Sequence, residues 1–268
     1  MKLLKPAKKS LGQNFLVDNN IIDKIIKIGN INEKKTVIEI GAGYGNLTKA
    51  IVEMKPKKLL AIEKDKKLSL ILKENFKSNK NIKIINDDFL NILKKNNFGQ
   101  NAIVFGNLPY NVSTKILASL ILLQKWPPWY DTLILMFQKE VAERILAKTN
   151  TKEYGRLAVL SNWRLEIKKH FNISANCFFP RPKITSTLLS FSVKKNNNYN
   201  LKNPKTLEKV TRILFSNRRK MINKNFNKLF KQNKFVEKKL NIDLKQRPEQ
   251  LAKEIFYRIG IEYEKLFY

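Results

Sequence analysis

Apolar residues in the first two-thirds of the chain follow two alternating spacings. Short runs that are apolar almost throughout are typical of strands buried on both faces. They occur at Thr36 to Ile40, Lys58 to Glu63, Ile82 to Ile85, Ala102 to Phe105 and Thr132 to Phe137. Between them the apolar positions recur three or four residues apart, which predicts helices at residues 18–28, 46–54, 68–76, 113–124 and 139–148. Strands that alternate with helices predict an α/β fold with a doubly wound, mostly parallel sheet.

The pattern changes in the last third of the chain. Residues 164–171 and 187–193 alternate between apolar and polar positions, as antiparallel strands at a sheet edge do. Residues 195–200 are a polar, low-complexity linker, and the rest has helical spacing without a strand pattern. We therefore predict two domains, an α/β domain at residues 1–195 and a small all-α domain at residues 196–268.

The charge of the chain narrows the choice of partner. A formal net charge of +31, from 53 basic and 22 acidic residues, favours a polyanion, and nucleic acid is the first candidate. An A/T-biased genome can also enrich lysine, although it does not require so few acids. The longest strongly apolar stretch, residues 116–123, is too short to span a bilayer. A single cysteine, Cys177, excludes an internal disulfide, and together with the lack of a secretory signal it predicts a cytoplasmic protein.

Three successive strand ends carry residues suited to a nucleotide-like ligand. Gly41 and Gly43 lie in a turn after the first strand of the sheet, where glycine lets the backbone approach a ligand closely. Glu63 ends the second strand, placed to accept hydrogen bonds from ribose hydroxyls. Asp88 follows the third strand and can reach an exocyclic amine. A chance turn beside ordinary surface acids is the alternative, but the ordered set predicts an adenosine-containing cofactor. The glycine spacing favours S-adenosylmethionine over NAD.

A fourth strand end carries the sequence Asn107, Leu108, Pro109 and Tyr110. The Asn107 side-chain oxygen and a backbone carbonyl can accept the two hydrogens of an amine, while the tyrosine ring stacks on the base that bears it. Asn-x-Pro is also an ordinary turn. Beside a methyl donor, the tetrapeptide predicts methylation of an amino group on a flat ring.

Taken together, the motifs resemble the ribosomal RNA adenine dimethyltransferases almost from end to end. The residues that carry the resemblance are Ser10 to Leu16, Glu39 to Gly45, Gly106 to Tyr110, Gln138 to Ala142, Tyr154 to Leu157, Phe178 to Lys183 and Phe215 to Lys220. The resemblance implies a seven-stranded methyltransferase sheet with a small helical domain. It also implies S-adenosylmethionine-dependent N6,N6-dimethylation of two adjacent adenosines near the 3′ end of small-subunit rRNA, coupled to maturation of the immature small subunit.

The resemblance also assigns roles to individual residues. It implies that Asn14 and Leu16 contact the cofactor, that Gly41 lies under its methionine part, that Glu63 binds the ribose, that Asp88 holds the adenine amine and that Asn107 joins the cofactor and target sites. Phe178 matches a second aromatic wall for the target base, with core packing as the alternative. The predicted enzyme is a monomer with no metal and no membrane attachment.

A basic cluster in the predicted helical domain is suited to RNA phosphates. It consists of Arg218, Arg219 and Lys220, and a solvated helix face is the alternative explanation for such a charge run. The residue that follows is Met221, where the family has threonine, which leaves the details of RNA contact open.

Other functions fit parts of the same pattern. A DNA adenine methyltransferase shares the Asn-x-Pro-aromatic logic, but no target-recognition insertion is visible. A large-subunit rRNA adenine methyltransferase of the antibiotic-resistance type shares fold and motifs. A non-catalytic assembly factor or transcription factor on the same fold is the third alternative. The intact cofactor set and residues 107–110 favour retained catalysis.

Overall fold

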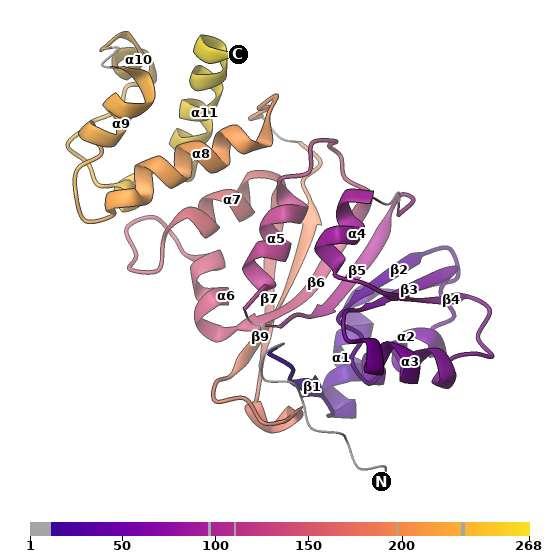
Figure 1. Ribbon diagram of the computed structural model, residues 1–268. Coiled ribbons are helices and arrows are strands. Elements are labelled where there is room, and N and C mark those ends of the chain that lie inside the picture. The colour runs from indigo at the N-terminus through magenta and orange to yellow at the C-terminus, as the bar shows by residue number, and fades with distance from the viewer. Residues whose placement is uncertain (1–11, 96–97, 110, 197, 232–233) are drawn as a thin grey trace. The chain divides into compact units, whose positions relative to one another are not determined.

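A computed structural model describes residues 12–95, 98–109, 111–196, 198–231 and 234–268. The chain divides into two compact units, each built from separate segments of the sequence. The sheet unit comprises the chain up to residue 116 together with residues 127–139 and 168–193. The helical unit comprises residues 117–126, 140–167 and 194–268. In Figure 1 the ribbon is coloured by residue number, so the separate segments of each unit appear in different colours.

The sheet has seven strands in the order β4-β3-β2-β5-β6-β9-β7. The strands are β2 (Thr36–Ile40), β3 (Lys58–Glu63), β4 (Ile82–Asn86), β5 (Ala102–Asn107), β6 (Tyr130–Gln138), β7 (Leu165–Ile173) and β9 (Ser186–Val193). The pairs β2–β3, β2–β5, β3–β4 and β5–β6 are parallel, whereas β6–β9 is antiparallel. The predicted α/β fold with a mostly parallel seven-stranded sheet is therefore confirmed.

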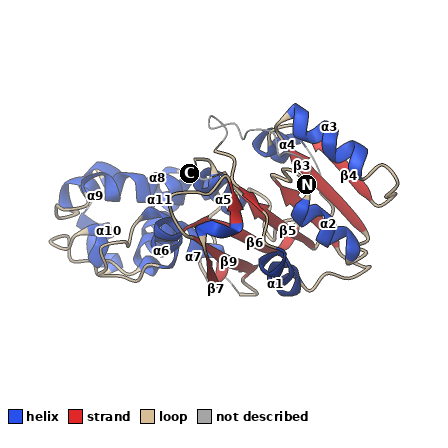
Figure 2. Cartoon of the chain, turned by 90° about the horizontal axis from the view of Figure 1, so that it is seen from below, coloured by secondary structure: helices blue, strands red, loops and turns tan. Residues whose placement is uncertain are grey.

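Helices α2 (Asn46–Glu53), α3 (Lys66–Asn75), α4 (Phe89–Lys95) and α5 (Ser113–Ile121) connect successive parallel strands, as crossover connections require. Helix α1 (Asn19–Gly29) precedes β2, and α6 (Lys139–Leu146) follows β6. In Figure 2 the strands run between α1 and α2 on one side and α4 on the other. Asp18 caps the first helix, because its Oδ1 accepts a hydrogen bond from Ile21 N at 3.1 Å. The short helix α4 was not predicted.

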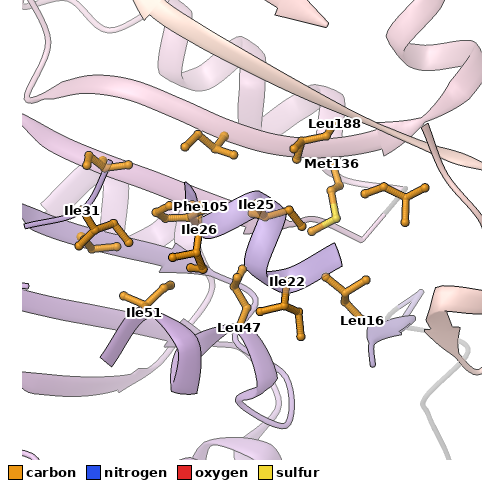
Figure 3. Close-up of a cluster of buried hydrophobic side chains, with 14 of the residues drawn as sticks. Leu16, Ile22, Ile25, Ile26, Ile31, Leu47, Ile51, Phe105, Met136 and Leu188 are labelled. Atoms are coloured by element: carbon orange, nitrogen blue, oxygen red, sulfur yellow. The ribbon is translucent and has the colours of Figure 1, made fainter. Parts of the chain in front are cut away.

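One face of the sheet is covered by the apolar stripe of α1. Ile22, Ile25 and Ile26 are buried at helical spacing and belong to one core cluster with Phe105 of β5 and Met136 of β6 (Figure 3). Residues at this spacing lie on one face of a helix, so a single face of α1 packs against two neighbouring strands. The packing fixes β5 and β6 relative to α1.

A two-stranded antiparallel ribbon, absent from the sequence prediction, is formed by β1 (Phe15–Leu16) and β8 (Phe178–Phe179). Leu16 lies opposite Phe178, and Phe15 lies opposite Phe179. The peptide bond between Phe179 and Pro180 is cis. Strands of two residues carry almost no pattern of their own, so pairing between distant segments had to form them.

The helical unit contains α7 (Arg156–Arg164), α8 (Pro204–Leu214), α9 (Asn223–Phe230), α10 (Lys234–Leu240) and α11 (Lys253–Phe267). Helix α11 packs against α7, α8 and α10. The last segment of the unit begins at residue 194, close to the predicted boundary, but the unit also takes in residues 140–167. The division of the chain into two domains at residue 195 stays a prediction. Within the described part of the chain, no helix is long and apolar enough to cross a membrane.

A buried arginine fixes part of the helical unit. Arg164 at the end of α7 is 5% exposed, and its Nη1 donates to Leu123 O at 2.9 Å and to Ile121 O at 3.3 Å. Its guanidinium carbon lies 3.8 Å from the ring centroid of Trp163 and 4.6 Å from that of Trp126. The cation thus satisfies carbonyls after α5 while its flat faces pack on indole rings.

Candidate active site

A pocket opens in the sheet unit at the carboxyl ends of β2, β3, β4 and β5, where an open α/β sheet binds ligands. Of the residues predicted for the site, it brings together Asn14, Gly41, Gly43, Glu63, Asp88, Asn107, Leu108 and Pro109. Tyr110 lies outside the described residues. The strand-end argument therefore located residues from four separate segments that meet in one pocket, and the family resemblance added Asn14.

Two predicted site residues are not among those lining this pocket. Leu16 is 4% exposed and borders a smaller adjoining cavity together with Gly41, Gly43 and Asn107. Phe178 is 3% exposed and belongs to the core cluster that also contains Leu16. Its described contacts therefore match the core-packing alternative, and its role as an aromatic wall stays a prediction.

The turn at Gly41 to Gly45 is held by the ring of Phe15 and by the carboxyl of Glu63. Gly43 has φ +59°, in the left-handed region, and a Cβ there would come within 2.8 Å of the Phe15 ring. Its N–H donates to Glu63 Oε2 at 2.8 Å. Only glycine allows this backbone and this close ring at once, so a side chain at residue 43 would displace Phe15 from the pocket wall.

Glu63 is committed to the backbone by both oxygens. Oε1 accepts from Asp65 N at 2.8 Å while Oε2 accepts from Gly43 N. Burial raises the pKa of this carboxyl, and the backbone hydrogen bonds only partly offset that effect. Each carboxylate oxygen still has a further lone pair, so the group can also accept from a ligand hydroxyl.

A second carboxyl, Glu39, lies at the end of β2 beneath the glycine turn. It is 2% exposed, and its Oε2 accepts a hydrogen bond from Thr48 Oγ1 at 2.6 Å. Burial is the main cause that raises the pKa of Glu39 to about 8, and the negative charge of Glu63 adds to it. Glu39 borders the smaller cavity rather than the main pocket.

Asp88 is held by a lysine that the sequence reasoning missed. Lys64 Nζ lies 2.9 Å from Asp88 Oδ2, and Leu90 N donates to Asp88 Oδ1 at 2.9 Å. Burial works to raise the pKa of Asp88, but these hydrogen bonds and the positive charges of Lys64 and Lys115 together outweigh it, so the pKa is lowered. Lys64 lines the pocket directly after Glu63, and its place at a strand end was the available signal.

The amide of Asn107 is oriented by the N-terminal segment. Asn107 Nδ2 donates to Asn14 O at 2.7 Å, which leaves Oδ1 as the acceptor of the side chain. Asn46 Nδ2 donates in the same way to Leu16 O at 2.7 Å. Two side-chain amides thus tie residues 14–16 to the glycine turn and to the end of β5. Asn46 carries no sequence signal for this contact.

The basic cluster at residues 218–220 lies in the helical unit and is not uniform. Arg218 Nε donates to Glu249 Oε2 at 2.9 Å, and its Nη2 donates to Thr151 O at 3.1 Å. Arg219 and Lys220 are exposed. Arg218 therefore joins distant segments of the helical unit, and the charges open to solvent belong to its two neighbours.

The fold and the pocket define a class of protein. A parallel sheet with an antiparallel strand beside β6, a glycine turn after its first parallel strand and acids at the next two strand ends make a Rossmann-like methyltransferase. The profile of the ribosomal RNA adenine dimethylase family matches residues 5–265. The chain belongs to that family.

Individual relatives agree with this assignment. A ribosomal RNA small subunit methyltransferase A from Pelagibacter ubique is 51% identical over 260 residues, covering 97% of this chain and 98% of the relative. The protein of that name from Zymomonas mobilis is 37% identical, covering 97% and 92% of the two chains. The described residues contain no group of three or more His, Cys, Asp or Glu placed to hold a metal ion.

Solved structures show the same fold. A dimethyladenosine transferase from Plasmodium falciparum aligns with a TM-score of 0.77 and 27% identity, covering 94% of this chain and 98% of that chain. The 23S rRNA methyltransferase ErmE aligns with a TM-score of 0.67 and 19% identity, covering 93% and 99%. At that lower identity the second comparison supports the fold alone.

Proposed function

We propose that this protein transfers methyl groups from S-adenosylmethionine to the N6 atoms of two adjacent adenosines near the 3′ end of small-subunit rRNA. The substrate is the immature small ribosomal subunit, and each target adenosine becomes N6,N6-dimethyladenosine. The observation that carries the proposal is Asn107, whose amide is fixed by Asn14 O at 2.7 Å beside a pocket with the residues for a nucleoside cofactor. The names of the similar small-subunit methyltransferases support the choice of rRNA.

The residues of the pocket fit S-adenosylmethionine. Gly41 has φ +77° and only the Asn107 carbonyl near its missing Cβ, so the backbone there leaves room for a ligand. Glu63 has lone pairs left for ribose hydroxyls, and Asp88 is kept ionised to accept from the adenine amine. Bound there, the cofactor supplies a methyl group activated by a positively charged sulfur. Asn14 and Leu16 are proposed to border it from the N-terminal side.

Asn107 and Leu108 then prepare the target amine. An adenine amine is a poor nucleophile because its lone pair is delocalised into the ring. When Asn107 Oδ1 and the Leu108 carbonyl accept its two hydrogens, the nitrogen becomes pyramidal and its lone pair is available. Pro109 holds the turn, and Tyr110 is proposed to stack on the base. The chain thus contributes positioning and preorganised acceptors rather than a strong base.

Arg219 and Lys220, with Arg218 behind them, are proposed to bind RNA phosphates. Two exposed cations in a chain of net charge +31 provide affinity for RNA phosphates that does not depend on the nucleotide sequence. The enzyme is proposed to act as a cytoplasmic monomer without a metal ion.

Methyl transfer from labelled cofactor to three substrates tests the proposal. Immature small subunits, large subunits and duplex DNA are offered in parallel, and the modified nucleotide is mapped. We expect label only in small-subunit rRNA, at two adjacent adenosines. Label confined to large subunits would replace the proposal by the antibiotic-resistance type of activity, and no transfer to any substrate would refute catalysis.

A further inference from the structure

The ribbon of β1 and β8 has one face in a core cluster and a second face outside that cluster. Successive residues of a strand point to opposite faces, and directly opposed residues of an antiparallel pair share a face. Leu16 and Phe178 are such a pair, and both are buried in the same core cluster. Phe15 and Phe179 form the other pair, so they share the face directed away from that cluster.

The second face of the ribbon carries a buried ring, Phe15, and an exposed ring, Phe179. Phe15 lines the pocket, and its ring packs edge-on against Tyr44 with the centroids 4.6 Å apart. Phe179, directly opposite, is 45% exposed. Because Phe179 pairs directly with a residue of the pocket wall, a ligand strand that enters the pocket can contact its exposed ring. The ring of Phe178, by contrast, already has its partners in the core.

The loop that follows Phe179 is basic. Arg181 and Lys183 are exposed, and no acidic residue occurs between Glu166 and Glu208. In the described part of the chain neither cation takes part in an ion pair. An aromatic ring beside free cations is the combination that binds single-stranded nucleic acid, with the ring stacking on a base and the cations holding phosphates. Charge complementarity therefore selects RNA as the occupant of this surface.

We propose that Phe179 stacks on an unpaired base next to the target adenosine, and that Arg181 and Lys183 bind the phosphates on either side. Phe179 would hold the strand beside the pocket while the target base enters it. The inference rests on the proposed function, because it requires RNA as the substrate. The contact that it assigns to Phe179 is separate from the predicted contact between Phe178 and the target base.

Substitutions at residue 179 separate stacking from simple apolar contact. The dissociation constant is measured by fluorescence anisotropy with an RNA hairpin that carries adjacent unpaired adenosines, in the presence of S-adenosylhomocysteine. We expect Phe179→Ala to weaken binding about tenfold, because base stacking on an aromatic ring is lost. Phe179→Trp should bind as the unaltered protein does, and Phe179→Leu should behave like the alanine variant. S-adenosylhomocysteine affinity should stay unchanged in all three.

Ile184→Ala is the matched control, since Ile184 is 40% exposed on the same loop but has no aromatic ring. It should leave RNA binding unchanged. In the double variant Arg181→Gln and Lys183→Gln, the slope of log affinity against log salt should become shallower by about 1.5. Unchanged RNA binding by Phe179→Ala, or full binding by Phe179→Leu, would overturn the inference. The proposed function would still stand if the unaltered protein transferred methyl groups to RNA. If the unaltered protein neither bound nor methylated RNA, both would fail.

Discussion

The pocket of the sheet unit and the basic cluster of the helical unit hold their polar side chains in different ways. In the pocket, Glu63 and Asn107 each have backbone partners at 2.7–2.8 Å. In the cluster, Arg219 and Lys220 extend into solvent, and Arg218 is tied to its own unit. The difference shows that placement of single atoms is secured by buried hydrogen bonds, whereas attraction to a polyanion needs only exposed charge.

Removal of the acceptor in the pocket should have the largest effect. In Asn107→Ala the target amine loses one acceptor, so methyl transfer should fall about 10²–10³-fold, as for loss of one preorganised polar group in other active sites. RNA affinity should stay unchanged. Single-turnover transfer and RNA binding are measured on the same preparation. Asn81→Ala, at an exposed asparagine just before β4, is the control, and near-normal transfer by Asn107→Ala would remove Asn107 from the reaction.

The buried carboxyl beneath the glycine turn should make stability depend on pH. With a folded pKa of about 8 and a value of 4.5 in the unfolded chain, Glu39 holds a proton in the native state that unfolding releases. The free energy of unfolding should therefore fall as pH rises from about 4.5 to about 8, and then level off. Glu39→Gln should remove most of this fall, because a glutamine side chain does not titrate.

Urea unfolding at several pH values measures this effect, with the exposed Glu33→Gln as the control. Parallel pH profiles for the Glu39 variant and the unaltered protein would show that Glu39 is ionised in both the folded and the unfolded state.

Glu63→Gln tests whether the fixed carboxylate also binds the ribose. The amide has one acceptor atom instead of two, so it cannot serve both Gly43 N and Asp65 N and a hydroxyl as well. We expect the dissociation constant for S-adenosylmethionine to rise about tenfold, with RNA affinity unchanged. Calorimetric titration measures it, and Glu53→Gln at the exposed end of α2 is the control. Equal cofactor affinity would assign Glu63 to the turn alone.

The smallest effect should come from the basic cluster. Arg219→Gln combined with Lys220→Gln should make the slope of log RNA affinity against log salt shallower by about 1.5, with cofactor affinity unchanged. Arg218→Gln should change the slope less and lower the melting temperature instead, because its partners Glu249 and Thr151 lose their contact. If Arg218 changed the slope as much as its neighbours, the contrast between the fixed and the free cations would be wrong.

Much of the pocket was predictable because parallel strands end at a common edge. The glycine turn, Glu63, Asp88 and Asn107 each follow an apolar run, and local pattern alone placed them near one another. Lys64 and Asn46 were not predicted as parts of the site. Their contacts, to Asp88 and to the carbonyl of Leu16, join segments that no local pattern relates.

The adjacent residues Phe178 and Phe179 show where the sequence argument ends. Both are phenylalanines, and the family motif favours the first, yet the first is 3% exposed and the second 45% exposed. Which of the two points outward depends on the pairing of β8 with β1, more than 160 residues away in the chain. A shift of one residue in that pairing would exchange their environments.

The sequence by itself determined the α/β class, the strand-end residues of the pocket and the family of this protein, because hydrophobic period and glycine placement act over a few residues. Only the tertiary structure decided which residues tie the pocket together, which phenylalanine of β8 is exposed and which arginine of the cluster is exposed. Those outcomes depend on contacts between distant segments, which form only when the whole chain is folded.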